Sequence, residues 1–89
     1  MNWVITADVE SPDATYEGIG AVDRTFGAHA LTDDLLARLP LRFRVLDDDG
    51  IPYYAGQADK QGFAPLDWAR ANAGCTEIQF AKGESWETL

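Results

Sequence analysis

Three consecutive aspartates followed by glycine, Asp47-Asp48-Asp49-Gly50, are the residues most suggestive of chemistry in this chain. Grouped carboxylates can hold calcium, but an EF-hand loop needs acids at alternate positions, glycine at the sixth and glutamate at the twelfth. Here the glycine comes fourth, and no acid lies between it and Asp59. We therefore expect no metal and no other cofactor, and we interpret the aspartates as a charged turn.

Covalent catalysis would need an activated nucleophile. His29 and Cys75 are the only residues of their kinds, so they form the one Cys-His pair to consider. No positive charge flanks Cys75, and a cysteine at the start of a strand is usually a small buried hydrophobe. The stretch Gly18-Ile19-Gly20 lacks the third glycine and the preceding strand of a dinucleotide-binding loop. The chain is therefore predicted not to be an enzyme, and a small hydrolase is the weaker alternative.

The net charge restricts the partners. Fifteen acidic and seven basic side chains give −8 at neutral pH. A field of that sign repels nucleic acid and anionic membranes, so direct binding to either is not expected and a natural partner should be cationic. Solubility alone is the other interpretation of such a charge.

The acids are unevenly placed, since residues 1–34 carry seven of them against Arg24 alone, a balance of −6. We predict that the aspartate turn and acids of this first segment contact a basic protein surface, with one tyrosine as an aromatic anchor. The predicted contact residues are Asp47, Asp48, Asp49, Tyr53, Asp23, Glu17, Asp13, Asp33 and Asp34.

A β-hairpin over residues 41–56 is predicted to hold the aspartates, because both arms have strand composition and Asp49-Gly50 is a strong turn signal. A two-residue turn there would pair Leu46 with Tyr53. A three-residue turn, with Gly50 in the left-handed conformation, would slip the register by one residue. We favour the two-residue turn.

Alternation along the hairpin predicts its two faces. Phe43 and Val45 should share the buried face, and Arg42 and Arg44 the outer one. Pro52 has no N–H to donate, which predicts an edge strand near the turn.

The remaining elements follow from capping residues and periodicity. Thr32 and Pro40 bound a short helix, and Pro65 and Gly74 bound a second one. The predicted order is a central strand at 3–6, a long loop at 7–30, a helix at 32–40, the hairpin, a helix at 63–74, a strand at 75–81 with Thr76, Ile78 and Phe80 inward, and a last strand at 85–89. This order predicts a single α+β domain over 1–89, with a mostly antiparallel sheet of four to five strands and one or two short helices on one face.

Four segments and a tryptophan resemble, together and in this order, a group of small uncharacterised bacterial proteins. They are WVITAD at 3–8, LDDDG with YYAG at 46–56, FAPLD at 63–67, AGCTEI at 73–78 and Trp86. The chain departs from the group at Val9, where histidine is expected, and in an insertion at 68–71. The resemblance implies a common fold and supplies no catalytic residues.

In size and charge only, the chain is similar to DNA-mimic inhibitors, including anti-CRISPR proteins. Such proteins present carboxylates at roughly phosphate spacing and occupy a Lys/Arg channel that otherwise holds nucleic acid. The similarity implies a non-enzymatic inhibitor of a nucleic-acid-binding protein, expected beside mobile-element or defence genes. The alternative is an accessory or self-associating structural domain. With no apolar run of about 18 residues and no signal-peptide core, we expect a cytoplasmic protein.

Overall fold

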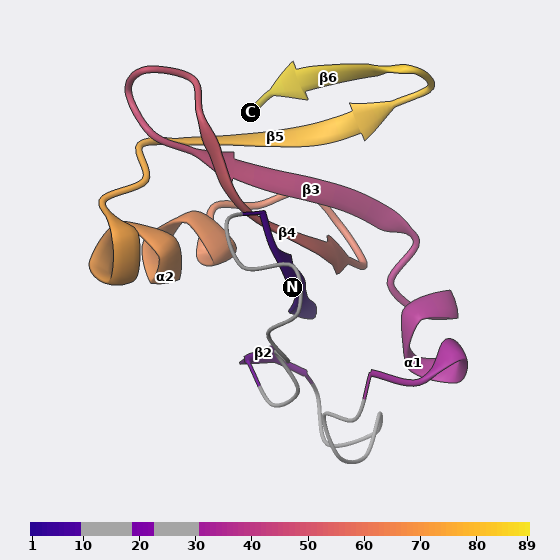
Figure 1. Ribbon diagram of the computed structural model, residues 1–89. Helices are drawn as coiled ribbons and strands as arrows, with labels where there is room; N and C mark the ends of the chain where they lie inside the picture. Colours follow the sequence, from indigo (N-terminus) through magenta and orange to yellow (C-terminus); the bar gives the residue numbers. More distant parts are fainter. Residues whose placement is uncertain (10–18, 23–30) are drawn as a thin grey trace.

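The computed structural model describes residues 1–9, 19–22 and 31–89, which form one antiparallel sheet and two helices (Figure 1). The elements are β1 (Trp3–Asp8), β2 (Gly20–Ala21), α1 (Asp33–Ala37), β3 (Leu41–Leu46), β4 (Pro52–Ala58), α2 (Ala64–Ala73), β5 (Glu77–Lys82) and β6 (Ser85–Thr88). The strand order is β2-β1-β4-β3-β5-β6. The α+β class is confirmed, with six strands in place of the four to five predicted.

The additional strand, β2, has only two residues and lies inside the predicted loop. Gly20 pairs with Val4 and Ala21 with Trp3. A glycine and an alanine carry no strand periodicity, so only the partner strand reveals this element. β1, predicted to lie centrally, is second from this edge of the sheet.

The β3–β4 hairpin has the predicted strand register but a different turn. Val45 pairs with Tyr54, as predicted, yet Leu46 pairs with Pro52 and not with Tyr53. The Asp47 N–H donates to the Ile51 carbonyl at 3.0 Å, and Gly50 has φ 76°, so the turn has three residues. The preference for a two-residue turn was wrong. A bulge at Tyr53 restores the register that the longer turn would have shifted.

Pro52 is the first residue of β4, one of the few places where a sheet tolerates proline. Its strand is not an edge strand, because β4 pairs with β1 on one side and with β3 on the other. The edge prediction is therefore wrong for β4 as a whole and holds only near the turn, at Pro52. The last pair between β1 and β4 joins Asp8 to Tyr54, so Pro52 lies beyond the β1 ladder.

The main core lies between one face of the sheet and α2. Trp3, Phe43 and Phe80 form a chain of aromatic contacts, with ring centroids 6.5 and 5.9 Å apart. Leu66 and Ala69 of α2 pack against them. Each buried aromatic side chain of this size contributes about 1.5–3 kcal/mol by leaving water. Ile78 and Phe80 point inward as predicted, but Thr76 is exposed because β5 begins only at Glu77.

The shorter helix, α1, packs on the opposite face of the sheet, so the prediction that the helices share one face was wrong. Leu35 and Leu39 form a second cluster with Val4, which alternates with the core residues Trp3 and Ile5. The Thr32 hydroxyl caps this helix by accepting from the Leu35 N–H at 3.2 Å. Alternation also places Arg42 and Arg44 on this face, as predicted.

Candidate functional site

The predicted aspartate site is a tight turn whose shape depends on Asp47. One carboxylate oxygen of Asp47, Oδ1, accepts from the N–H groups of Asp49 and Ile51, both at 2.9 Å. The other, Oδ2, accepts from the Tyr53 hydroxyl at 3.1 Å. A side chain that bonds the backbone N–H two residues ahead is the usual reason why aspartate favours turns. Both oxygens of Asp47 thus have partners within the hairpin.

These hydrogen bonds stabilise the ionised form of Asp47. The N–H of Ile51 makes the largest contribution, and the Tyr53 hydroxyl adds to it, so the pKa of the Asp47 carboxyl lies below its ordinary value. Asp47 is therefore negatively charged throughout the neutral range, and its carboxylate is occupied by hydrogen bonds within the hairpin.

Asp48 and Asp49 have different surroundings. Both are exposed at the tip of the turn. The ion pairs formed within the described ranges join Asp67 to Arg70 and Lys82 to Glu87, and neither involves the turn. These two carboxylates are thus available to an external cation.

Tyr53, the predicted anchor, is half-buried and packs against the main core while its hydroxyl bonds Asp47. Its ring therefore supports the turn from within the hairpin. The structure brings Tyr53 together with Asp47 and, through the turn, with Asp48 and Asp49.

The other predicted contact residues are not brought to this turn. Asp33 and Asp34 begin α1, which precedes β3, whereas the turn follows it (Figure 1). The six residues of β3 separate them, about 17–20 Å for a strand of that length. Asp13, Glu17 and Asp23 lie outside the described residues.

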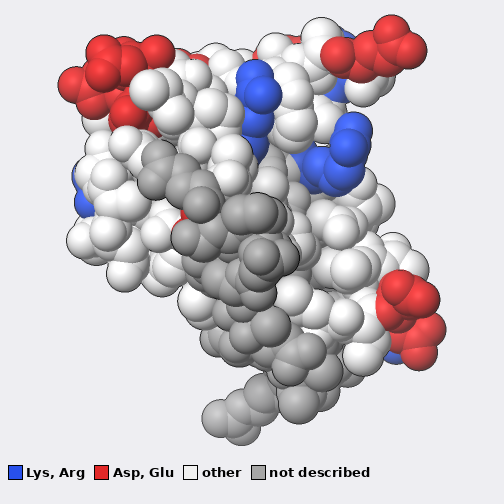
Figure 2. Space-filling model, in the orientation of Figure 1, with Lys and Arg blue, Asp and Glu red and all other residues white. Residues whose placement is uncertain are grey.

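Figure 2 shows the consequence for the surface: acidic side chains form separate groups at corners of this face, and basic side chains lie between them over the sheet. No single acidic row runs along the described residues on this side. Of these groups, the aspartate turn is the one whose backbone and Tyr53 are hydrogen-bonded to an aspartate, Asp47.

Sequence reasoning missed a cationic and aromatic cluster on the sheet face opposite α2. The guanidinium carbon of Arg44 lies 4.4 Å from the centroid of the Trp86 ring, and that of Arg42 lies 6.0 Å from it. The Arg44 Nε also donates to Gln79 Oε1 at 2.8 Å. The alternation of β3 placed both arginines on the outer face, but only the β5–β6 hairpin brings Trp86 to them.

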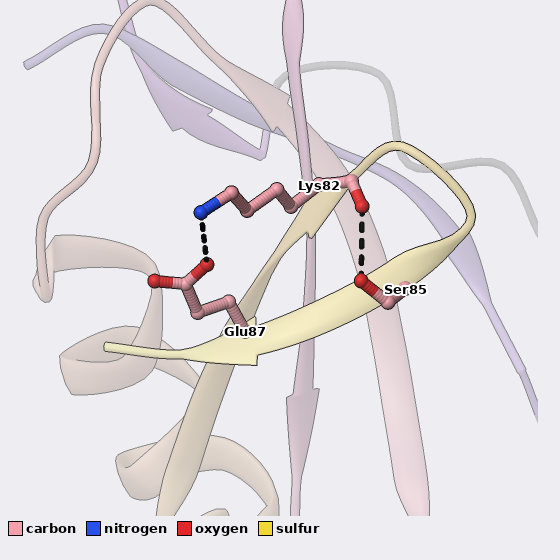
Figure 3. Close-up of polar contacts among 3 residues, drawn as sticks. All are labelled: Lys82, Ser85 and Glu87. Carbon is pink, nitrogen blue, oxygen red and sulfur yellow. Dashed lines mark hydrogen bonds and ion pairs between the residues drawn. The ribbon is translucent and has the colours of Figure 1, made fainter.

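Lys82 lies at the end of this hairpin and has an acidic partner of its own. Its Nζ is 3.3 Å from Glu87 Oε2, and its carbonyl accepts from the Ser85 hydroxyl at 3.0 Å (Figure 3). Neither Arg42 nor Arg44 forms an ion pair with a carboxylate of the described residues. Lys82 thus has a carboxylate partner, whereas the two arginines lie over the Trp86 ring.

Cys75 is fully buried in the main core, and this burial raises the pKa of its thiol. A thiol with a raised pKa forms little thiolate at neutral pH and is a poor nucleophile. Its proposed partner in catalysis, His29, lies outside the described residues.

Within residues 1–9, 19–22 and 31–89, no group of three or more His, Cys, Asp or Glu side chains is arranged to hold a metal ion. The helices of these residues are too short or too polar to cross a membrane. Comparisons with protein-family models, with curated proteins and with solved structures find no match to this chain.

Proposed function

We propose that this protein is a non-enzymatic inhibitor that binds a basic surface of a nucleic-acid-binding protein or complex through Asp48 and Asp49. The observation that carries the proposal is the exposure of these two carboxylates at the tip of a turn that Asp47 holds in shape. A preordered turn loses little conformational entropy on binding, so little of the binding free energy is spent on ordering it.

The electrostatics support the same partner class. The net charge of −8 attracts a cationic protein and repels free nucleic acid. Carboxylates that meet lysine and arginine side chains compete with phosphates for the same donors. Occupation of such a surface by this chain would exclude the nucleic acid.

The test is a pull-down from the source cell with the immobilised chain, which is compared with the variant Asp48→Asn/Asp49→Asn. This variant removes two charges and keeps the Asp47 hydrogen bonds. The expected result is that the wild type retains a Lys/Arg-rich nucleic-acid-binding protein, releases it as salt rises, and loses it to an oligonucleotide competitor. The variant should retain at least tenfold less.

The matched control is Asp33→Asn/Asp34→Asn, which removes the same charge from α1 at the far end of β3. If both variants bind equally well, the turn is not the contact. If the retained protein is indifferent to salt and to the oligonucleotide, the inhibitor function is wrong.

A further inference from the structure

The cluster formed by Arg42, Arg44 and Trp86, called the arginine face below, is the feature that the proposed function does not use. Alternation along β3 points both arginines away from the core residues Phe43 and Val45. Trp86 is half-buried beneath them. A cation close to an aromatic ring in this way is stabilised by about 0.5–1 kcal/mol at an exposed site and by more when water is removed.

The described hydrogen bonds of the arginine face involve the neutral amide of Gln79 and, through it, the carboxylate of Glu77. Glu77 Oε2 accepts from Gln79 Nε2 at 2.8 Å and from the Thr88 hydroxyl at 3.1 Å. Gln79 in turn accepts from Arg44. No described carboxylate lies within ion-pair distance of either guanidinium group. The two guanidinium groups are thus positive charges without an ion-pair partner among the described residues of a strongly acidic chain.

The same chain carries a negative group on the Asp48-Asp49 turn, and no ion pair joins that turn to these arginines in the described structure. Arg44 and Arg42 lie three and five residues before Asp47 on an extended strand, about 10 and 17 Å at ~3.3 Å per residue. The turn carries Asp48 and Asp49 beyond that point, and Arg44 reaches sideways to Trp86 and Gln79. A second molecule can bring these opposite charges together.

We infer that the arginine face binds a second copy of this chain, with the Asp48-Asp49 turn of each copy against the arginines of the other. In the arrangement that we infer, the two-fold axis is perpendicular to β3 and lies in the plane of the contact. The two β3 strands then run antiparallel, and each turn lies toward the arginines of its partner. An interface of this kind is isologous, because one surface carries both halves of the complementary pair. The inference does not rest on the proposed function.

The size of the contact predicts weak association. Three strands spaced about 4.8 Å apart and about 17–20 Å long present a few hundred Å². A stable dimer buries about 800 Å² per partner. Exposed ion pairs add at most about 1 kcal/mol each. Association should therefore be reversible and detectable only at high protein concentration.

Long-range repulsion between two chains of −8 is screened at physiological ionic strength, where the Debye length is about 8 Å. Local charges at the contact then decide whether two copies associate. This makes charge reversal a direct test of which residues meet.

The experiment measures the average mass by sedimentation equilibrium for two charge-reversal variants, alone and mixed. Arg42→Glu/Arg44→Glu leaves the turn intact, and Asp48→Arg/Asp49→Arg leaves the arginine face intact. Each variant alone should lose at least tenfold in association, because like charges then face each other. The equimolar mixture should regain it, since both contacts of the mixed pair are again between opposite charges.

The matched control is Lys60→Glu/Arg70→Glu, which makes the same change in net charge at two exposed positions elsewhere. This control should associate within about twofold of the wild type. A wild type that stays monomeric at millimolar concentration, a mixture that is not restored, or a control that fails equally would each overturn the inference. Arg42→Glu alone changes the more exposed of the two arginines and should leave the fold intact. A loss of association in this single variant therefore cannot be attributed to unfolding.

The result is independent of the proposed function. Arg42→Glu/Arg44→Glu keeps Asp48 and Asp49, so it should still retain the basic partner in the pull-down. A wild type that retains the basic partner but does not self-associate would overturn only this inference, and a wild type that self-associates but retains no such partner would overturn only the proposed function.

Discussion

Asp47, Asp48 and Asp49 are identical side chains in three consecutive positions, but hydrogen bonding separates them. Asp47 accepts from two backbone N–H groups and from Tyr53. No such partner holds the carboxylates of Asp48 and Asp49 in the described hairpin. One aspartate therefore maintains the turn, and the other two supply its exposed charge.

Replacement of Asp47 by alanine should lower the free energy of unfolding at neutral pH. The folded-state pKa of Asp47 is depressed, so its contribution is fully present above the ordinary carboxyl pKa of about 3.9. That contribution is lost as the pH falls through the lower, folded-state value. The gap between wild type and Asp47→Ala in urea unfolding should accordingly shrink below about pH 4.

Asp48→Ala is the control for this prediction, because it removes a charge from the same turn without removing those hydrogen bonds. It should unfold at nearly the wild-type urea concentration at every pH. Equal destabilisation by the two substitutions would mean that the carboxylate of Asp47 does not hold the turn.

At the scale of elements, α1 shows how a helix of five residues is kept in place. So short a helix is unstable alone. Leu35 and Leu39 bury their side chains against Val4. The side-chain amide of Gln57, on β4, donates to the carbonyls of Leu36 at 3.2 Å and Leu39 at 2.8 Å. Strand β4 thus supplies a donor to the Leu39 carbonyl beyond the helix end and a further donor to the Leu36 carbonyl, which also accepts from the Leu39 N–H.

Gln57→Ala should therefore cost about 1–2 kcal/mol of unfolding free energy, as expected for two net hydrogen bonds. The loss of stability should be larger around α1 than in the rest of the fold. Hydrogen exchange of the Leu36 and Leu39 amides, which bond the carbonyls of Thr32 and Leu36, should accelerate more than that of β5. Gln61→Ala, at an exposed loop position, is the control. Unchanged exchange in α1 would show that Gln57 does not anchor it.

At the scale of the whole molecule, acidic and basic side chains both contribute to the described surface. On the face shown in Figure 2, acidic side chains form separate groups at the corners and basic side chains lie between them. A mixed surface of this kind combines a large net charge with a local patch of the opposite sign. Acidic composition alone therefore does not describe what the molecule presents to a partner.

If two copies associate through the arginine face, folding is linked to concentration. A chain at about ten times its dissociation constant gains about 1.4 kcal/mol, because only the folded form associates. The thermal midpoint should rise by about 5–10 °C between dilute and concentrated samples of a domain this size. The midpoint of Arg42→Glu/Arg44→Glu should not change with concentration. A wild-type midpoint that is equally constant would count against the linkage.

Much of the fold follows from local patterns in the sequence. Thr32 and Gly74 mark helix ends because capping is a local interaction. Phe43 and Ile78 are buried because side chains alternate between the two faces along a strand. β2 has no local signal, since its two residues are ordered by pairing with Trp3 and Val4. The placement of α1 depends on which sheet face Val4 presents, and that is a tertiary property.

The candidate site was predicted in part. The aspartate turn is visible as a run of like residues, but its division into one capping and two exposed side chains depends on the turn type. Trp86 and Arg44 are far apart in sequence and meet only because β3, β5 and β6 are neighbours. Such cross-strand contacts depend on strand order, which local patterns do not specify.

The three-residue turn and the bulge at Tyr53 offset each other, since each adds one residue to the same hairpin. The number of residues between Phe43 and Gly56 is consequently not fixed by the ladder that joins them. A homologue two residues shorter, with a two-residue loop and a regular β4, would keep Phe43 and Val45 in the core. Length variation in this hairpin would then alter the acidic tip and leave the strand register of the sheet unchanged.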